Sequence, residues 1–370
     1  MPKYRFTEIA INSTEKKKPT EADKETYIGL EHLDSGTLTV SRWGSEVAPI
    51  GEKLLMKKGD VLFGKRRAYQ KKVGIAPFDG IFSAHGMVLR PREEVITKEY
   101  FPLFISSDYF LNEAIRISVG SLSPTVNWKD LKDLTFIIPT IEEQRRITPL
   151  VWAAIKAKNA YKSLIQRTDD LVKSQFIEMF GNPVTNAKHW PTQPLKKVAP
   201  EHTPRIPTTE KYWWLNLDMI ESYSGNIIEK VYAELDEIGS STSTFDETMV
   251  LYSKLRPYLN KVVVPEDFGY ATTELVGLKP DPTVLNKYFL FNLLRGDDFV
   301  SYANGIAGGA QMPRMPVKSL REFECILPPL ELQEQFVALS KQSDKSKFEL
   351  QEAIVRIDNF IKSLIQQDDN

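Results

Sequence analysis

The chain has 370 residues, 42% of them hydrophobic and 26% charged, which excludes an intrinsically disordered chain and leaves room for two domains of ordinary size. No apolar stretch approaches the roughly 18 residues of a membrane-spanning helix, and the first residues lack the pattern of a signal peptide. The one cysteine, Cys325, cannot form a disulfide within the chain, so we expect a cytoplasmic protein without membrane association. The formal net charge of −1 neither requires nor excludes a nucleic-acid partner, so the distribution of charge must decide.

The second half of the sequence repeats the first half at a constant shift. Residues 61–73 return as 250–262 without a gap, and the same shift places residues 137–144 on 326–333. The period is far longer than the roughly 20 to 50 residues of a solenoid repeat, so the sequence predicts a duplicated domain. Two such copies are expected to pack about a pseudo-twofold axis. The alternative is a duplication without functional consequence.

The first part of each copy predicts a mixed α+β globular domain. These parts are residues 1–140 and 184–329, which are rich in β-branched and aromatic residues broken by Gly, Pro, Asn and Asp. The residue pattern predicts strands and helices in both copies. The predicted strands are 37–40, 61–63 and 87–89 in the first copy and 262–264 and 323–327 in the second, and the predicted helices are 98–117 and 286–302.

A basic cluster occurs at the same place in both copies. Cations suit the phosphates of DNA, so a cluster repeated in a chain without net positive charge indicates a DNA contact. The alternative is a solvated basic hairpin. The predicted DNA-binding residues are Lys65, Arg66, Arg67, Tyr69, Lys71 and Lys72 in the first copy and Lys254, Arg256, Tyr258 and Lys261 in the second.

Two loops that follow the clusters are further candidates for DNA contact. They cover residues 120–127 and 305–314, and Arg314 could reach a phosphate or a guanine edge. Features present in both copies suit the invariant DNA backbone, so we expect base choice where the copies differ, as in 14–26 against 203–214.

Each copy ends in a long segment with a helical apolar pattern, residues 141–183 and 330–370. Each would form a helix of roughly 55 Å. The apolar residues in the second segment step by four and three, the heptad pattern of a coiled coil. We expect the two helices to pair antiparallel, whereas the alternative is that each covers only its own domain. Pro149 predicts a kink near residues 147–148, and Asp169 and Asp170 are expected on a surface face. The predicted pairing residues are Ile165, Val172, Phe176, Leu350, Ile354, Ile357, Ile361 and Leu364.

Motifs of catalysis are missing from the sequence. It contains neither a phosphate-binding Gly-x-x-x-x-Gly-Lys-Ser/Thr nor a dinucleotide-binding Gly-x-Gly-x-x-Gly, and it lacks the Asn/Asp-Pro-Pro-Tyr/Phe element of adenine methylation. Four scattered histidines and one cysteine make no zinc pattern. We therefore expect a non-catalytic protein without a cofactor or metal of its own.

Several stretches resemble the specificity subunits of type I restriction-modification systems. The proline-led helix starts at 138–144 and 327–333 are similar to the start of the conserved helical regions of that family, as is the helix end at 171–183. Residues 27–34 and 63–69 resemble the family as well.

The resemblance implies that residues 1–140 and 184–329 are target recognition domains, each reading one half of a bipartite double-stranded DNA sequence. The helices of 141–183 and 330–370 would hold them apart. Two methyltransferase subunits, which carry S-adenosylmethionine and the adenine-methylating chemistry, would dock on the helices, and motor-nuclease subunits would join through them. The alternatives are the separate recognition chain of a fused methyltransferase-nuclease, a duplicated protein-protein scaffold, and an enzyme with an unrecognised metal or cofactor.

Overall fold

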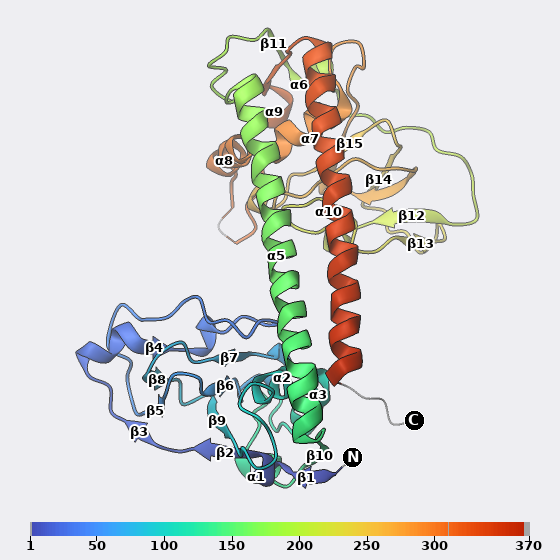
Figure 1. Cartoon of the computed structure of the whole chain (residues 1–370). Coiled ribbons are helices and arrows are strands. Elements are labelled where there is room, and N and C mark those ends of the chain that lie inside the picture. Colours follow the sequence, from blue (N-terminus) through green and yellow to red (C-terminus); the bar gives the residue numbers. More distant parts are fainter. Residues whose placement is uncertain (1, 310, 366–370) are drawn as a thin grey trace. The chain divides into compact units, whose positions relative to one another are not determined.

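A computed structural model describes residues 2–309 and 311–365 of the chain. Contacts divide the chain into two compact units, the first made of residues 1–162 and 351–370 and the second of residues 163–350 (Figure 1). Both units combine helices with sheets, so the predicted mixture of α and β structure is confirmed.

The first unit contains three small sheets. Strands β1 (Lys3–Arg5) and β10 (Thr135–Ile137) pair antiparallel, which joins the two ends of the globular part. One four-stranded sheet has the order β2-β9-β6-β7 and the other has the order β3-β5-β8-β4, in which β4 and β8 are parallel. Their strands are β2 (Ala10–Ser13), β3 (Lys16–Lys17), β4 (Tyr27–Ile28), β5 (Lys53–Met56), β6 (Val61–Phe63), β7 (Val73–Ile75), β8 (Gly80–Phe82) and β9 (Met87–Pro91).

Aromatic residues fill the main core of this unit. The ring of Phe110 lies 5.1 Å from Phe6, 5.5 Å from Phe104 and 5.6 Å from Phe136, distances at which aromatic pairs attract beyond simple burial. A smaller core around Ile28, Met56 and Phe82 belongs to the same unit. The short helices are α1 (Phe6–Ile9), η1 (Glu21–Thr26), η2 (Leu30–His32), η3 (Ala68–Gln70), α2 (Phe101–Ser106), α3 (Asp108–Arg116) and α4 (Trp128–Leu131).

Two sequence predictions for this unit were wrong. The predicted helix 98–117 is split into α2 and α3, because Ser107 is extended and its Oγ accepts a hydrogen bond from the Phe110 N–H, which starts a new helix. In the described structure, residues 37–40 form no strand, and only Thr39 among them pairs, in an isolated bridge with Ile75. Gly36, with φ of 74°, turns the backbone just before them.

The second unit repeats the sheet plan in a simpler form. Strands β11 (Thr192–Pro194) and β19 (Glu324–Ile326) pair antiparallel, a second sheet has the order β13-β12-β17-β14 with β12 and β17 parallel, and a third has the order β16-β15-β18. The strands of the second and third sheets are β12 (Tyr212–Leu215), β13 (Val231–Ala233), β14 (Thr242–Phe245), β15 (Val250–Ser253), β16 (Val262–Val263), β17 (Gly269–Thr272) and β18 (Leu275–Leu278).

The helices of the second unit cover a core around Phe176, Phe289 and Phe336, where the ring of Phe176 lies 5.5 Å from Phe289 and 5.3 Å from Phe336. The predicted helix 286–302 was wrong as a single helix, because extended backbone at Gly296 divides it. The short helices are α6 (Leu195–Val198), η4 (Leu217–Met219), η5 (Pro257–Leu259), α7 (Lys287–Arg295), α8 (Asp297–Ile306) and α9 (Val317–Arg321).

Each unit includes part of both long helices. Helix α5 (Ile141–Phe180) begins in the first unit and ends in the second, whereas α10 (Leu330–Ile365) does the reverse. In the second unit, Asp169 contacts Lys347 and Phe176 contacts Phe336, so the two helix segments run antiparallel there. Helix α5 continues through Pro149, and the kink expected there stays a prediction.

The predicted pairing residues occupy buried or half-buried positions. Ile361 and Leu364 of α10 pack against the main core of the first unit, and Val172 and Phe176 of α5 belong to the core of the second. The alternative in which each helix covers only its own domain is therefore wrong. Half-buried positions are also found for Ile165, Leu350, Ile354 and Ile357. The four-part division at residues 140, 183 and 329 stays a prediction.

Candidate nucleic-acid interface

The basic cluster of the first unit lies on the turn between β6 and β7. Arg67 and Lys71 flank η3 with φ angles of 55° and 50°, a left-handed conformation that is unusual for residues with long side chains. The Arg67 N–H donates to the Pro124 carbonyl at 2.7 Å, and the Val126 N–H donates to the Lys65 carbonyl at 2.9 Å. These two hydrogen bonds attach the turn to the loop of residues 120–127, which the sequence analysis gave as a further candidate for DNA contact.

The second unit has the same turn with the same backbone bonds. Arg256 and Asn260 flank η5 with φ angles of 49° and 48°. The Arg256 N–H donates to the Pro313 carbonyl at 2.7 Å, and the Met315 N–H donates to the Lys254 carbonyl at 2.9 Å. The sequence repeat is therefore also a repeat of an unusual backbone geometry.

Several of the predicted DNA-binding side chains are open to solvent. Arg66 and Arg67 are exposed, and the rings of Tyr69 and Tyr258 are 53% and 43% exposed. Lys65 is half-buried, and its burial lowers the pKa of its ammonium, with nearby Lys16 acting in the same direction. Exposed guanidinium groups can form bidentate hydrogen bonds with phosphates or with guanine edges.

Other predicted cations have partners within the chain. The ammonium groups of Lys72 and Lys261 each donate at 2.7 Å to a backbone carbonyl, that of Leu30 in the first unit and that of Leu217 in the second. Arg314 forms an ion pair with Glu274 at 3.0 Å, so its expected reach to a phosphate or guanine requires this pair to open. The roles of these residues in DNA binding stay predictions.

Each candidate loop contains a bridge that is followed by a left-handed glycine, whereas Gly305 and Ile306 of the second loop belong to α8 and Ala310 lies outside the described residues. Val119 forms a bridge with Thr125, and Gly120 between them has φ of 117°. In the second unit Gly308 pairs with Arg314 in the same way, and Gly309 has φ of 107°. Leu122, at the tip of the first hairpin, is 90% exposed.

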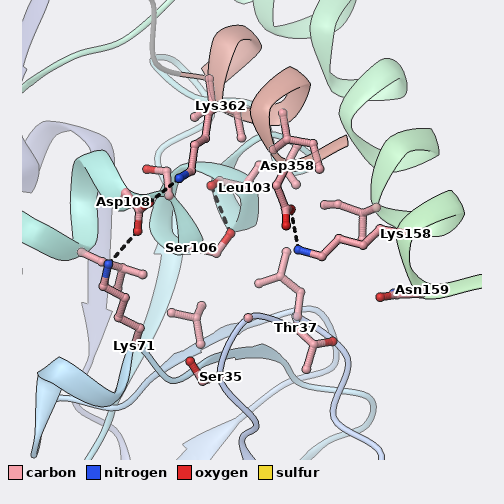
Figure 2. Close-up of a pocket in the computed structure, with 18 residues that line it drawn as sticks. Ser35, Thr37, Lys71, Leu103, Ser106, Asp108, Lys158, Asn159, Asp358 and Lys362 are labelled. Carbon is pink, nitrogen blue, oxygen red and sulfur yellow. Dashed lines mark hydrogen bonds and ion pairs between the residues drawn. The ribbon is translucent and has the colours of Figure 1, made fainter. Parts of the chain in front are cut away.

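Behind the basic turn of the first unit, charged side chains connect it to the long helices (Figure 2). Lys71 contacts the carboxylate of Asp108 at 2.7 Å, and Lys362 of α10 reaches the same carboxylate at 3.6 Å. The hydrogen bond from Lys71 is the largest cause that lowers the pKa of Asp108, so this carboxyl stays ionised. Lys158 of α5 and Asp358 of α10 form a further ion pair at 2.5 Å.

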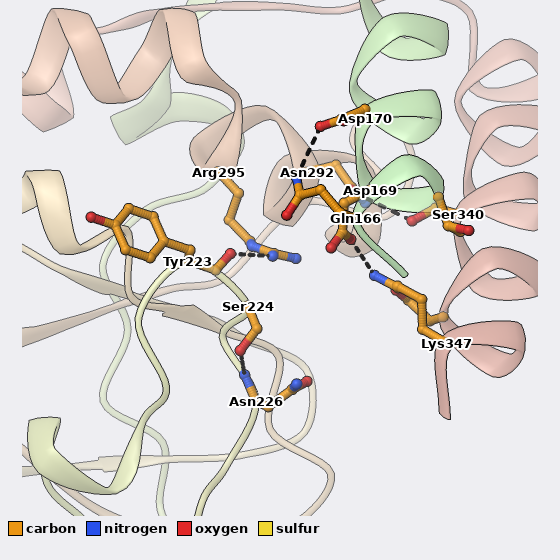
Figure 3. A network of polar contacts seen from close by, with 12 residues as sticks. Gln166, Asp169, Asp170, Tyr223, Ser224, Asn226, Asn292, Arg295, Ser340 and Lys347 are labelled. Carbon is orange, nitrogen blue, oxygen red and sulfur yellow. Dashed lines mark hydrogen bonds and ion pairs between the residues drawn. The ribbon is translucent and has the colours of Figure 1, made fainter. Parts of the chain in front are cut away.

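The second unit has a matching polar network (Figure 3). Lys347 contacts Asp169 at 2.6 Å, and Lys173 contacts Asp297 at 2.7 Å. Asp169 is half-buried with 39% of its side chain exposed, so the surface position expected for it is met in part, and a heptad pattern read from apolar residues alone misses its ion pair with Lys347. Asp170 is exposed and accepts a hydrogen bond from Gln166.

Sequence reasoning missed these ion pairs although the repeat contains a signal for them. At the shift of the repeat, Lys158 corresponds to Lys347 and Asp169 to Asp358, so one pair is the copy of the other with the helices exchanged. Comparing charged residues across the repeat would have found them.

Within residues 2–309 and 311–365, side chains of His, Cys, Asp and Glu form no group of three that could hold a metal ion. No helix of that same part of the chain is long and apolar enough to cross a membrane.

Comparisons with known proteins agree on one family. Residues 6–157 match the domain family described as Type I restriction modification DNA specificity domain. The type I restriction enzyme EcoDI specificity subunit of Escherichia coli is 21% identical over 288 residues, or 66% of this chain. The aligned part is 64% of that relative, so the chain spans slightly less than two thirds of its length.

Two solved structures share the fold over nearly the whole chain. The S subunit of a type I restriction-modification system from M. genitalium has a TM-score of 0.56 at 14% identity, with 99% of this chain and 96% of that chain covered. A chain from a structure of complex assembly and conformational transition in the type I restriction-modification system has a TM-score of 0.56 at 18% identity, with 98% and 96% covered.

The fold is thus that of an S subunit, with helices and small sheets in both units. In sequence, the chain is similar to type I restriction-modification DNA specificity subunits, with the family match over residues 6–157. The resemblance stated from the sequence is confirmed.

Proposed function

We propose that the chain selects a bipartite double-stranded DNA target, with one half read by residues 1–140 and the other by residues 184–329. The observation that carries the proposal is the basic turn, which has left-handed residues at the same two positions and the same bond to a proline carbonyl in both units. Strained conformations of this kind persist where the surrounding structure enforces them, and they concentrate at functional sites. Two copies of one turn suit two contacts with the repeating DNA backbone.

The long helices are proposed to pair antiparallel as a coiled coil along their length and so to set the spacing between the two recognition domains. The ion pairs Lys158–Asp358 and Lys347–Asp169, one in each unit, support a fixed register, because charged partners inside a helix seam disfavour other alignments.

Catalysis is proposed to reside in partner subunits. Two methyltransferase subunits would dock on the helices and their flanks, supply S-adenosylmethionine and methylate adenine, and motor-nuclease subunits would join through them. The chain would have no activity alone and would work in the cytoplasm. The match of residues 6–157 to the type I restriction-modification DNA specificity domain supports this arrangement.

The test is to sequence N6-methyladenine in host DNA with the gene intact and with the gene deleted. Loss of methylation at one split motif on deletion is the expected result, and it would also identify the bases. Methylation of a split motif that persists unchanged after deletion, with the partner genes expressed, would contradict the proposal.

A protein-protein scaffold is the second candidate. It is favoured by the internal partners of Lys72, Lys261 and Arg314, which leave fewer free cations than the sequence indicates. A scaffold would show no strong dependence of DNA binding on salt, whereas a DNA reader loses affinity steeply as salt rises.

A further inference from the structure

A cavity in the first unit lies between the basic turn and the long helices (Figure 2). Its volume of about 320 Å³ is at the lower end of the range of small-molecule sites, which begins at roughly 300 Å³. Its wall is apolar over much of its area and carries hydroxyl and charged groups elsewhere. The apolar wall comes from Leu38, Val73, Leu103, Leu111, Ile155, Ile361 and Ile365.

The second unit shows what fills the corresponding place there. Ser106 lines the cavity, and the residue that the repeat aligns with it is Arg295. The Arg295 guanidinium lies 4.6 Å from the ring of Phe291 and donates to the Tyr223 carbonyl at 2.5 Å (Figure 3). The short side chain of Ser106 leaves that volume open in the first unit.

The charges around the cavity of the first unit and those around Arg295 in the second unit do not balance in the same way. Among residues 2–309 and 311–365, the cavity is lined by three ammonium groups, those of Lys71, Lys158 and Lys362, and by two carboxylates, those of Asp108 and Asp358. One carboxylate, Asp108, serves two of the lysines, at 2.7 and 3.6 Å. The described lining of the cavity therefore has one positive charge in excess.

At the corresponding place in the second unit, the described cations and anions are equal in number. Arg295, Lys173 and Lys347 face three carboxylates, of which Asp169 and Asp344 both contact Lys347 and Asp297 contacts Lys173. One added negative charge would give the cavity of the first unit the same balance. An added cation would instead raise the excess to two.

We propose that this cavity binds a small organic anion, a carboxylate on an apolar body. The carboxylate would lie among Lys71, Lys158 and Lys362, and the apolar body would lie against the leucines and isoleucines of the wall. At about 30 Å³ for each water-sized group, the cavity holds no more than about ten non-hydrogen atoms. Because the lining comes from α5, α10 and the basic turn, the ligand would brace all three.

The test uses the full-length protein and three probes of nearly equal shape. They are phenylacetate, 2-phenylethanol and 2-phenylethylammonium, which carry a negative charge, no charge and a positive charge. In titration calorimetry we expect phenylacetate to bind one site with a Kd below about 1 mM, equivalent to about −4 kcal/mol, and the other two probes to bind at least tenfold more weakly. Absence of phenylacetate binding, or equal binding of all three probes, would overturn the proposal.

Variants locate the site. Ser106→Arg copies the second unit and should abolish phenylacetate binding by filling the cavity. Lys362→Gln removes the excess charge, breaks only the longer of the two contacts to Asp108, and should weaken binding at least tenfold. The matched control is Lys173→Gln at the corresponding place in the second unit, which should bind as the wild type does. Wild-type affinity in a folded Lys362→Gln variant would refute the site even where Ser106→Arg fails to fold.

Discussion

Gln144 and Gln333 make the same three hydrogen bonds at the starts of the two long helices. The Nε2 of Gln144 donates to the carbonyls of Pro139 and Val95, and its Oε1 accepts from the Thr97 N–H at 2.7 Å. Gln333 does the same with Pro328, Val284 and Asn286, and both glutamines are fully buried. These bonds join each helix start to the globular part before it.

Replacing either glutamine by leucine should therefore destabilise its unit. The side chain fits, but two carbonyls and one N–H lose their partner, at a cost of about 1–3 kcal/mol for each group left buried without a hydrogen bond. Urea unfolding of Gln144→Leu and Gln333→Leu should show this decrease in stability. Gln144→Glu keeps the acceptor for Thr97 but places a buried carboxylate against the carbonyls of Pro139 and Val95, so it should cost at least as much as Gln144→Leu; a smaller cost would count against this account.

Lys72 and Lys261 should act on stability more than on DNA affinity. Lys72→Met leaves the Leu30 carbonyl without its ammonium donor, which we expect to lower the free energy of unfolding by about 1–3 kcal/mol. Lys98→Met, at an exposed position outside the cluster, is the control and should be neutral. A decrease in the salt dependence of DNA binding without a decrease in stability would show that Lys72 contacts phosphate instead.

Lys65 and Arg256 are expected to contact phosphates. Lys65→Ala or Arg256→Ala should weaken binding to all sequences alike and reduce the slope of log K against log salt by about 0.9 for each phosphate that is no longer neutralised. Binding titrations at several salt concentrations measure this slope, with Lys98→Ala as the control. A slope equal to that of the wild type would show that these residues do not bind phosphate.

Exchanging residues 1–140 for the corresponding part of another family member should change only one half of the methylated motif. The reason is that each unit has its own turn, loop and core, so the bases that a unit selects depend on the side chains of that unit. Methylome sequencing of the exchanged chain is the measurement. A change in both halves of the motif would contradict the assignment of one half to each domain.

Asp23 makes the first unit sensitive to acid. The hydrogen bond from Lys17, together with those from Thr20, lowers the pKa of Asp23 to about 2 from its ordinary value of 3.8. A lowered carboxyl pKa stabilises the folded chain above the unfolded pKa, and this stabilisation is lost as the pH falls from about 4 towards 2. The difference in Tm between the wild type and Asp23→Asn should be constant from pH 5 to 7 and shrink below pH 4. A difference that does not change with pH would contradict this.

The sequence predicted best those parts of the molecule in which residues of similar chemistry recur at a fixed spacing, either between the two copies or along one helix. The basic turns, the proline-led helix starts and the apolar seam of α10 are of this kind. Strand 37–40 failed because a left-handed Gly36 overrides the β preference of the residues after it. The hydrogen bond from Lys72 to the Leu30 carbonyl and the ion pair of Asp169 with Lys347 join residues that are distant in the sequence. A local sequence pattern holds no information about such partners.

The cavity beside Ser106 could not be predicted for a related reason. A serine and an arginine at equivalent positions look like ordinary surface variation, since either residue is common on a helix end. Only the neighbouring side chains of the wall, which come from α2, α5 and α10, show that the exchange leaves an open space.

The way α10 ends has a consequence for synthesis of the chain. The core of the first unit is covered in part by Ile361 and Leu364, which leave the ribosome only after the whole second unit, residues 163–350, has been made. At about 5–20 residues per second, the first unit waits roughly 10–40 s with part of its core exposed to water. The chain is therefore most exposed to aggregation and to chaperones while its second half is still being made, and a nascent chain stopped near residue 350 would retain that exposed patch.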